Sequence, residues 1–347
     1  MRPRTLLPVV ATVAALALTG CSASSDSSDP SATGTDDGVY SVTHEAGTTD
    51  DVPVDPQKIV VLDEYAALNM MEIGVVPDVV FGGLSSEVGA VLLEDQGVEL
   101  IAAPTMILDP DFEAIAAEEP DLIVLTTPGD TIADTYPSFS EIAPTIVLPY
   151  EKSWQEMLEI TGQAFQREEA AATVASALQT KLDAVVAEAG DDPGTISLLG
   201  SFQDIYYSQA MINPVSITLD TVGFTRPQVE EDGVPTGASS TAVTFSAEEL
   251  PEHDADTTVL MDGSIYDAEA VRELPTFSTL TSVANDRVFV ANGELWSANF
   301  ALGTWWVLDD VETILANGTA VPLGTLDDAT ERWQELQDAI AAIDAAA

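Results

Sequence analysis

The residue types that carry most catalytic and metal chemistry in proteins are scarce in this chain. It has two histidines, His44 and His253, and one cysteine, Cys21. Cages of several histidines, four-cysteine zinc sites and disulfide frameworks therefore cannot be built from it. The sequence also contains no Gly-x-Ser-x-Gly elbow, His-Glu-x-x-His motif, phosphate-binding loop or Gly-x-Gly-x-x-Gly fingerprint. We therefore expect no enzymatic activity, no resident cofactor and no metal bound directly by the protein.

Carboxylates are the reactive side chains that the sequence has in abundance, and their large number limits what a pair of them can indicate about function. The 347 residues include 59 Asp and Glu against 10 Lys and Arg, a net charge of 10 − 59 = −49. Pairs of carboxylates, as an exported glycosidase would use, are inevitable at this density and so carry no information. A nucleic-acid partner is excluded, because phosphate binding needs clustered cations. A hydrophobic content of 46% still predicts a folded protein.

The N-terminus predicts export. Residues 1–20 form a signal peptide, with two arginines before an apolar run over residues 5–18. The small residues before Cys21 resemble the lipobox of bacterial lipoproteins, in which this cysteine is acylated and becomes the mature N-terminus. An ordinary signal peptide with an incidental cysteine is the alternative. Residues 21–38 then form a lipidated, flexible, acidic and serine-rich tether, so we expect a lipid-anchored protein on the extracytoplasmic face of the cell membrane.

From residue 39 onward, short apolar runs rich in β-branched residues alternate with helical patterns such as residues 64–73 and 111–118. Strands that alternate with helices predict parallel sheets covered on both faces. The predicted strands are 59–62, 79–81, 122–125, 145–148, 196–199, 259–261 and 288–290. The fold class is therefore α/β, with two Rossmann-like lobes.

One long helix is predicted between the lobes. Ser153 and Glu156 form a capping box, and apolar residues recur at helical spacing over residues 154–189. A single helix of this length could brace two lobes, and two helices broken near Gly162 are the alternative. The expected organisation is an N-terminal lobe over 39–152, a connecting helix over 153–190 and a C-terminal lobe over 191–347.

The two halves repeat each other. In residues 111–125, Glu113 precedes Asp121 by eight positions, and in residues 246–260 Glu248 precedes Asp256 by eight. Each Asp opens a predicted strand. A second pair of similar segments, Leu68–Gly74 and Leu219–Gly223, ends in glycine in both halves. Such internal similarity favours two lobes of one design.

The order of these features is similar to that of a known family. Phrases along residues 40–316 resemble the substrate-binding lipoproteins of iron–siderophore ABC transporters. They are VTHEAG (42–47), PQKIVVL (56–62), DFEAI (111–115), PDLI (120–123) and DRVF (286–289), with the helix start at Trp154 and the Trp296 segment. The resemblance implies a helical-backbone binding protein that captures a ferric chelate between its lobes.

The resemblance also implies partners. Such proteins deliver their ligand to a membrane permease, which works with an ATPase, and one surface glutamate on each lobe docks to permease arginines. By position in the repeated phrase these glutamates are Glu113 and Glu248. Acidic residues that merely begin helices are the alternative explanation. A monomeric binding protein is expected.

The candidate ligand contacts are aromatic residues after the predicted strands and one arginine in a loop of the C-terminal lobe that is expected to face the cleft, because open α/β sheets bind ligands at the carboxyl ends of their strands. They are Tyr65, Tyr206, Tyr207, Arg226 and Trp296. Arg226 is the best cation for a ligand oxygen, with a local salt bridge to Glu230 or Glu231 as the alternative. Packing in the core is the alternative for the aromatic residues.

A ferric siderophore of the hydroxamate type is the favoured ligand, because the chain cannot easily cluster the basic residues that hold a trianionic catecholate. Met106 stands near the position where hydroxamate binders often carry an arginine, which is a departure from the family's pattern. Haem or cobalamin, which proteins of the same architecture bind, is the alternative. Direct ligation of haem iron would need Tyr206, Tyr207 or His253, and His253 is expected in a surface turn.

Overall fold

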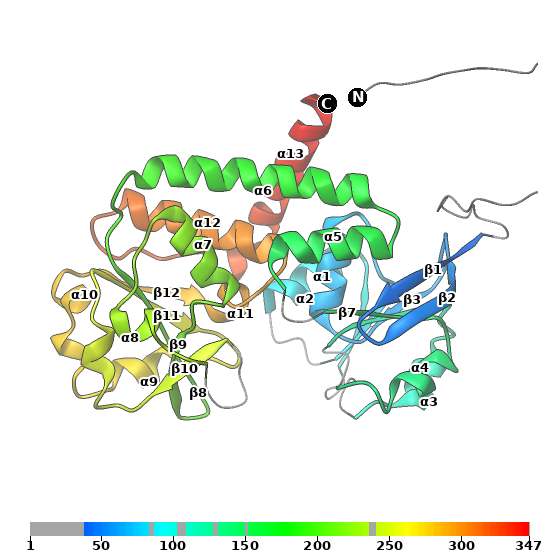
Figure 1. Cartoon of the computed structure of the whole chain (residues 1–347), viewed down its shortest axis with the longest axis horizontal. Coiled ribbons are helices and arrows are strands. Elements are labelled where there is room, and N and C mark those ends of the chain that lie inside the picture. Colours follow the sequence, from blue (N-terminus) through cyan, green and yellow to red (C-terminus); the bar gives the residue numbers. More distant parts are fainter. Residues whose placement is uncertain are drawn as a thin grey trace, which may run out of the picture. The chain divides into compact units, whose positions relative to one another are not determined.

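From residue 38 onward the chain contains two five-stranded sheets with helices around them (Figure 1). The structure is a computed structural model, and it describes residues 38–82, 87–102, 109–127, 131–149, 152–235 and 241–346. The predicted signal peptide, Cys21 and Met106 lie outside these residues.

The N-terminal sheet is entirely parallel, with strand order β5-β4-β3-β6-β7. Its strands are short apolar runs buried on both faces, which is why they read as continuous rather than alternating patterns. A separate hairpin, β1–β2, precedes them. The elements of this lobe are β1 (Val39–His44), β2 (Gly47–Pro53), β3 (Ile59–Val61), α1 (Glu64–Glu72), β4 (Val79–Phe81), α2 (Glu87–Asp95), β5 (Glu99–Ile101), α3 (Phe112–Ala117), β6 (Leu122–Thr126), α4 (Tyr136–Ser140) and β7 (Thr145–Leu148).

The C-terminal sheet has the equivalent order, β10-β9-β8-β11-β12, but it is mixed. Strand β9 runs antiparallel to β8 because only Gln203 and Asp204 connect them, and both have positive φ (50° and 64°), as a tight hairpin requires. The elements are β8 (Ile196–Phe202), β9 (Ile205–Gln209), α7 (Pro214–Val222), α8 (Gln228–Glu231), β10 (Ala242–Phe245), η1 (Leu250–His253), β11 (Thr257–Asp262), α9 (Ala268–Arg272), η2 (Phe277–Thr279), α10 (Thr281–Ala284), β12 (Val288–Asn292), α11 (Gly293–Trp296) and α12 (Ala301–Ala316). All seven predicted strands are present, and the parallel sheet predicted for this lobe is corrected to a mixed one.

The predicted internal repeat is visible in the backbone. Asp121 precedes β6 and accepts hydrogen bonds from the amides of Gln57 (2.7 Å) and Lys58 (3.0 Å), just before β3. Asp256 precedes β11 and accepts from the amide of Thr195 (2.9 Å), just before β8. In each lobe an aspartate at the equivalent position thus aligns the starts of the two central strands. This explains why an Asp precedes the second of these strands in both halves of the sequence.

The segment predicted as one helix over 154–189 is two helices, α5 (Trp154–Ala164) and α6 (Glu168–Ala189). The chain reverses between them, where Gln166 adopts a φ of 54°, in the left-handed region that no α-helix can contain. The single long helix is therefore wrong, and the alternative of a break near Gly162 is correct.

The reversal lays α5 against α6. A Cβ at Gly162 would lie only 2.7 Å from the Cβ of Ala171, so glycine is required for this close approach. The 22 residues of α6 span about 33 Å, and Figure 1 shows this helix running across the top of both lobes. The bracing role expected of the whole segment is thus taken by α6.

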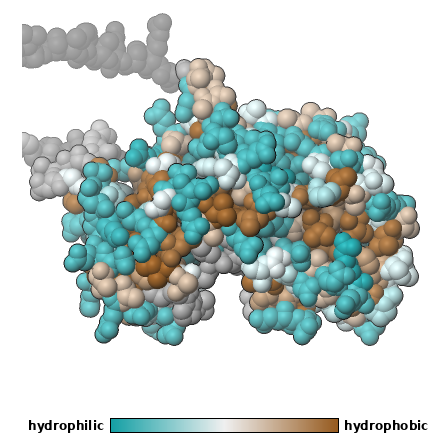
Figure 2. Space-filling model, turned by 180° about the vertical axis from the view of Figure 1, so that it is seen from behind, coloured by the Kyte–Doolittle hydropathy of each residue, from teal (hydrophilic) through white to brown (hydrophobic). Residues whose placement is uncertain are grey.

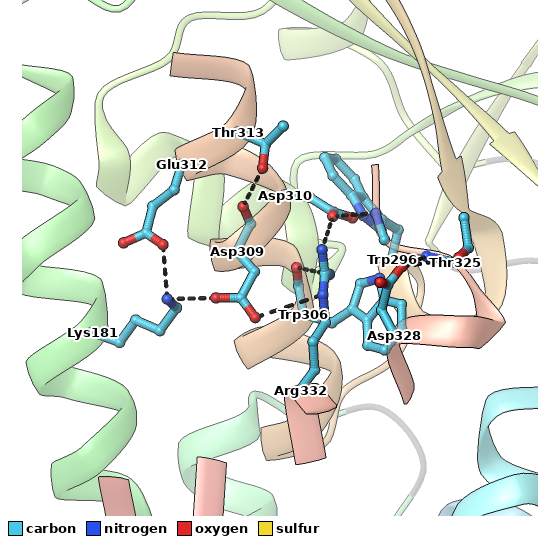
Figure 3. A network of polar contacts seen from close by, with 11 residues as sticks. Lys181, Trp296, Trp306, Asp309, Asp310, Glu312, Thr313, Thr325, Asp328 and Arg332 are labelled. Carbon is cyan, nitrogen blue, oxygen red and sulfur yellow. Dashed lines mark hydrogen bonds and ion pairs between the residues drawn. The ribbon is translucent and has the colours of Figure 1, made fainter. Parts of the chain in front are cut away.

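The C-terminal helix α13 (Ala329–Ala346), which follows the short η3 (Leu326–Asp328), does not simply extend the C-terminal lobe as the boundary 191–347 predicts. The Thr330 hydroxyl donates to Asp95 on α2 of the other lobe (3.2 Å). Helix α13 also takes part in an ionic network that joins three helices (Figure 3). In this network Lys181 of α6 contacts Asp309 of α12, and Asp309 also faces Arg332 of α13. Helix α13 therefore fastens the two lobes together.

One apolar core runs beneath the helices of both lobes. It includes Met70 of α1, Leu158 of α5, Leu178 of α6, Leu219 of α7 and Trp306 of α12. Smaller cores fill the other face of each sheet. Because the main core is shared, the lobes pack as one unit.

A carboxylate is buried in this shared core. At the C-terminal end of α1, Oε1 of Glu72 accepts a hydrogen bond from the amide of Leu302 (2.6 Å), and Oε2 accepts from the amide of Ala301 (3.1 Å). Both amides belong to the first turn of α12. Burial raises the pKa of Glu72 to about 8, although the two amide hydrogen bonds oppose the rise.

We predict that Glu72 makes stability depend on pH. Because its pKa is raised in the folded protein, its contribution is fully present below the unfolded value of 4.5 and is lost as the pH rises through about 8. The free energy of unfolding of the wild type, relative to Glu72→Gln, should therefore fall across this window. Each unit of pKa shift corresponds to about 1.4 kcal/mol. Urea unfolding of both proteins at the two ends of the window measures the difference, and parallel pH profiles would contradict it.

Candidate functional site

A pocket of about 260 Å³ lies between the lobes, and residues of both lobes line it. Seen from the back, the body is notched between the lobes (Figure 2). The N-terminal side contributes Tyr65 and the start of α5, and the C-terminal side contributes the start of α7 and the segments before β10 and α12. The lining residues are Tyr65, Lys152, Ser153, Glu156, Ile212, Pro214, Ile217, Thr241, Ser297 and Asn299.

Tyr65 reaches the pocket from the first turn of α1. The side chain of Asp63 caps this helix by accepting from the amide of Ala66 (2.8 Å), and it also accepts from the amide of Thr126 at the end of β6 (2.6 Å). The cap therefore fixes α1 at the carboxyl edge of the sheet, where α/β proteins bind ligands. Burial raises the pKa of Asp63 to about 6, against the opposing hydrogen bonds.

The start of α5 brings one positive and one negative charge to the pocket. Ser153 and Glu156 form the predicted capping box: the Glu156 amide donates to Ser153 Oγ (3.3 Å), and the Ser153 amide donates to Glu156 Oε2 (3.2 Å). Hydrogen bonds from Ser153, and to a smaller extent the charge of Lys152, lower the pKa of Glu156. The carboxylate therefore stays ionised beside Lys152.

The C-terminal wall is partly apolar. Asn213 caps α7 by accepting from the amide of Val215 (3.0 Å), and Pro214 occupies the first turn. This arrangement leaves Ile212 and Ile217 facing outward, with 64% and 46% of their surface exposed. Large aliphatic side chains held at this exposure on a pocket wall indicate a surface that a partly apolar ligand would cover.

Ser297, on the same wall, is held from behind. Its Oγ lies 3.2 Å from the Tyr266 hydroxyl and 3.2 Å from Gln209 Nε2. Gln209 in turn accepts from Asn213 Nδ2 (2.8 Å), so the cap of α7 and the pocket hydroxyl share one support. The polar groups of this wall are therefore preorganised.

Of the five predicted ligand contacts, only Tyr65 lines the pocket. Trp296 is fully buried, and its Nε1 donates to Oδ2 of Asp310 (2.8 Å; Figure 3). The prediction for Trp296 fails because α11 follows β12 directly and turns the indole into the shared core rather than toward the cleft.

Tyr206 and Tyr207 lie in β9 rather than in a loop, and successive side chains of a strand point to opposite faces. Tyr206 stacks on Phe245, with ring centroids 6.1 Å apart. Tyr207 is buried across Gly200, which has no side chain to displace it, and burial raises its pKa far above the usual value. The structure therefore gives both tyrosines packing roles.

Arg226 is buried in the C-terminal lobe, and the alternative of a local salt bridge is correct. Its guanidinium pairs with Glu230 and donates to Ser216 Oγ (2.9 Å) and to the carbonyl of Gln209 (3.3 Å). Glu230 also contacts Nδ1 of His253 (2.8 Å). His253 is fully buried, so the expected surface turn is wrong, and neither residue reaches the pocket.

Lys152 is the basic residue of the pocket, and the sequence interpretation missed it as a ligand contact because it lies at the boundary between the predicted N-terminal lobe and the connecting helix. It stands immediately before the capping box of α5, a few residues after the carboxyl end of β7. Its place in the pocket could have been recognised from the sequence, because Lys152 is the only cation between the end of a predicted strand and the start of a predicted helix on the cleft side.

The two predicted docking glutamates are exposed and lie in equivalent places. Glu113 is in the first turn of α3, before β6, and Glu248 is in the turn before η1 and β11. Among the described residues, no group of three or more histidine, aspartate or glutamate side chains is arranged to hold a metal ion.

Two α/β lobes of equal strand order, fastened by helices and separated by a preformed pocket, define a bilobal ligand-binding protein. The sequence matches the family described as periplasmic binding protein over residues 106–295, more than half of the chain, and it belongs to this family.

The relatives agree with this assignment. The chain is 25% identical over 328 residues to the probable siderophore-binding lipoprotein YfiY of Bacillus subtilis, covering 87% of this chain and 94% of that one. It is 26% identical to the ferric enterobactin-binding periplasmic protein FepB of Escherichia coli, over 55% of this chain and 63% of that one. Staphylococcus aureus SirA complexed with staphyloferrin B has the same fold, with a TM-score of 0.62, 21% identity, and coverage of 80% and 98%. The predicted resemblance to siderophore-binding proteins is confirmed.

We predict that Arg226→Ala unfolds the protein more readily instead of merely weakening ligand contact. It leaves the Glu230 carboxylate buried without its guanidinium, which costs about 3–5 kcal/mol when one partner of a buried pair is removed. Urea unfolding measures this loss. Arg272→Ala, which removes a cation without an ion pair among the described residues, is the control. Equal stability of the two variants would contradict the structural role.

Proposed function

We propose that this protein is the extracytoplasmic solute-binding lipoprotein of an ABC importer and captures a ferric siderophore, as a monomer, in the pocket between its lobes. The observation that carries the proposal is the preformed pocket lined by both lobes. The names of YfiY and FepB, and the siderophore bound to SirA, support a ferric siderophore as the ligand class.

The charge of the pocket favours a hydroxamate complex, which is neutral or cationic. Lys152 and Glu156 nearly cancel at the pocket edge, and Ile212 and Ile217 offer apolar surface. A trianionic catecholate would find one cation beside one carboxylate in a strongly acidic protein, which opposes its binding. The ligands named for FepB and SirA differ from one another, so the pocket, not the similarity, is our basis for this choice.

Most of the other basic residues of the body bond to protein groups outside the pocket. Of the eight from residue 39 onward, five bond to protein groups away from the pocket: Lys58, Lys181, Arg226, Arg287 and Arg332. Arg167 and Arg272 lie at the N-cap of α6 and the end of α9. Lys152 alone among the eight lines the pocket.

Acylation of Cys21 would hold the body at the membrane. The description of YfiY as a lipoprotein supports this anchor. Among the described helices, none combines the length and apolarity that crossing a bilayer requires. A diacyl or triacyl cysteine provides the two or more chains that stable anchoring needs.

We predict that the full chain binds one ferric hydroxamate saturably at submicromolar concentration. Intrinsic tryptophan fluorescence is titrated with ferrioxamine, ferrichrome, a ferric catecholate, ferric citrate, haemin and cobalamin, with free iron salts as controls. Lys152→Ala should weaken a neutral or cationic complex by less than about tenfold, because the lysine contributes little Coulomb energy to an uncharged ligand.

The same titrations separate the alternatives. Preferred binding of the catecholate, with a loss of more than about tenfold in Lys152→Ala, would overturn the hydroxamate proposal. Haemin binding with a Soret band would instead favour the haem alternative. Glu94→Ala, on the exposed surface of α2, serves as the control for a charge change away from the pocket.

Glu113 and Glu248 are proposed to dock the two lobes onto arginines of the permease. The double variant Glu113→Ala/Glu248→Ala should bind ligand as the wild type does and transport it poorly, because the exposed carboxylates do not line the pocket. Uptake of radiolabelled ferric siderophore by cells that rely on this protein measures transport. Loss of ligand binding itself would remove both residues from a docking role. Glu94→Ala/Glu269→Ala, exposed on α2 and α9, is the matched control.

A further inference from the structure

Helix α12 begins in the C-terminal lobe without a cap of its own. Phe300 stands at the N-cap position and makes no side-chain hydrogen bond to the helix. The first amides of a helix need acceptors, and burial makes an unpaired amide costly. Here the acceptors come from the other lobe, because Glu72 of α1 accepts from both Ala301 and Leu302.

Glu72 has no other partner to hold it. Only 4% of its surface is exposed, and no cation among the described residues bonds to it. The two amides at the start of α12 are therefore the hydrogen-bond donors that its buried carboxyl oxygens need. The carboxyl group of Glu72 and the first turn of α12 therefore satisfy each other's hydrogen bonds across the boundary between the lobes.

This contact is connected to the pocket on both sides. Seven residues before Glu72 on the same helix, Tyr65 lines the pocket. Just before α12, Ser297 and Asn299 line the opposite wall. Between them, the Phe300 ring meets the Tyr65 ring edge-on, with centroids 5.7 Å apart. Both pocket walls therefore lie next to the contact that Glu72 makes between the lobes, which we call the joint.

We propose that Glu72 is a positioning residue for ligand binding: by capping α12 from the opposite lobe, it fixes Tyr65 relative to Ser297 and Asn299 and so sets the width of the pocket. The effect on affinity rests on the proposed function. The effect on the spacing of the lobes does not, because it is measured without ligand.

The test compares Glu72→Gln with Asp121→Asn. The Asp121 carboxylate also accepts two backbone amides, but both lie within the N-terminal lobe and away from the pocket. Each variant is made in the full chain with Cys21→Ser, so that cysteines introduced for Glu94 and Glu269 are the only thiols. Spin labels on these two cysteines, one on each lobe, report inter-lobe distances by pulsed electron spin resonance.

We expect a single narrow distance distribution for the wild type and Asp121→Asn, and a broadened one for Glu72→Gln. Ferric hydroxamate affinity should fall by about tenfold in Glu72→Gln and stay near the wild-type value in Asp121→Asn, because Gln has one acceptor oxygen for the two buried amides. Glu72→Asp, which keeps the carboxyl group but shortens its reach, should behave like Glu72→Gln and serves if that variant folds poorly.

An unchanged distance distribution in both Glu72 variants would show that Glu72 does not fix the spacing of the lobes, whatever ligand the protein binds. Broadened distances with unchanged affinity would overturn the positioning role and leave the joint as a purely structural contact. If no chelate in the panel binds the wild type, the proposed function fails while the distance comparison still decides whether Glu72 fixes the lobes.

Discussion

The shared apolar core beneath the helices is the constraint on which the rest of the molecule depends. Helices α1, α5, α6, α7 and α12 all contribute buried side chains to it, and α13 closes it from the C-terminal end. Interiors are close-packed, and exposing apolar surface costs about 25 cal/mol per Å². A large opening of the lobes would break this packing. The pocket between them is therefore largely preformed, and ligand affinity must come from a surface that needs little reorganisation.

The small number of basic residues is a second constraint, and it determines the electrostatics of the molecule. The chain has 59 acids and 10 bases, and four of the eight bases from residue 39 onward pair with buried or partly buried carboxylates: Lys58, Lys181, Arg226 and Arg332. Asp309 and Asp310 illustrate this: burial raises the pKa of each, Lys181 and Arg332 oppose the rise at Asp309, and Arg332 opposes it at Asp310. Few cations remain for a ligand, which is the basis of the preference we propose for ligands of low negative charge. Glu72 differs from these acids, because two backbone amides of α12 hold it in place of a base.

The sequence was sufficient for the architecture because buried parallel strands are continuous apolar runs and the repeated Glu-to-Asp spacing marks a repeated contact. It was insufficient where geometry depends on a few residues. A two-residue turn at Gln203 and Asp204 makes β9 antiparallel, and Gln166 breaks the connecting segment. The site was harder still. Tyr65 could be placed from its strand end. Trp296 follows a strand equally closely, and Arg226 lies in the loop after α7, but both are buried by tertiary packing that no local pattern records.

Rigidity also bears on how two lobes can act together. The lobes share a strand order, and the same helix-to-strand phrase precedes the fourth strand of each sheet, so Glu113 and Glu248 occupy equivalent exposed positions. In a protein with a loose hinge their separation would vary with every opening of the cleft. Here the common core, α6 across both lobes and the Glu72 cap hold the two halves at one spacing. If Glu113 and Glu248 dock onto a permease as proposed, a fixed spacing would both shape the pocket and present these two carboxylates in register, so that one structural constraint would serve the proposed capture and the proposed delivery alike.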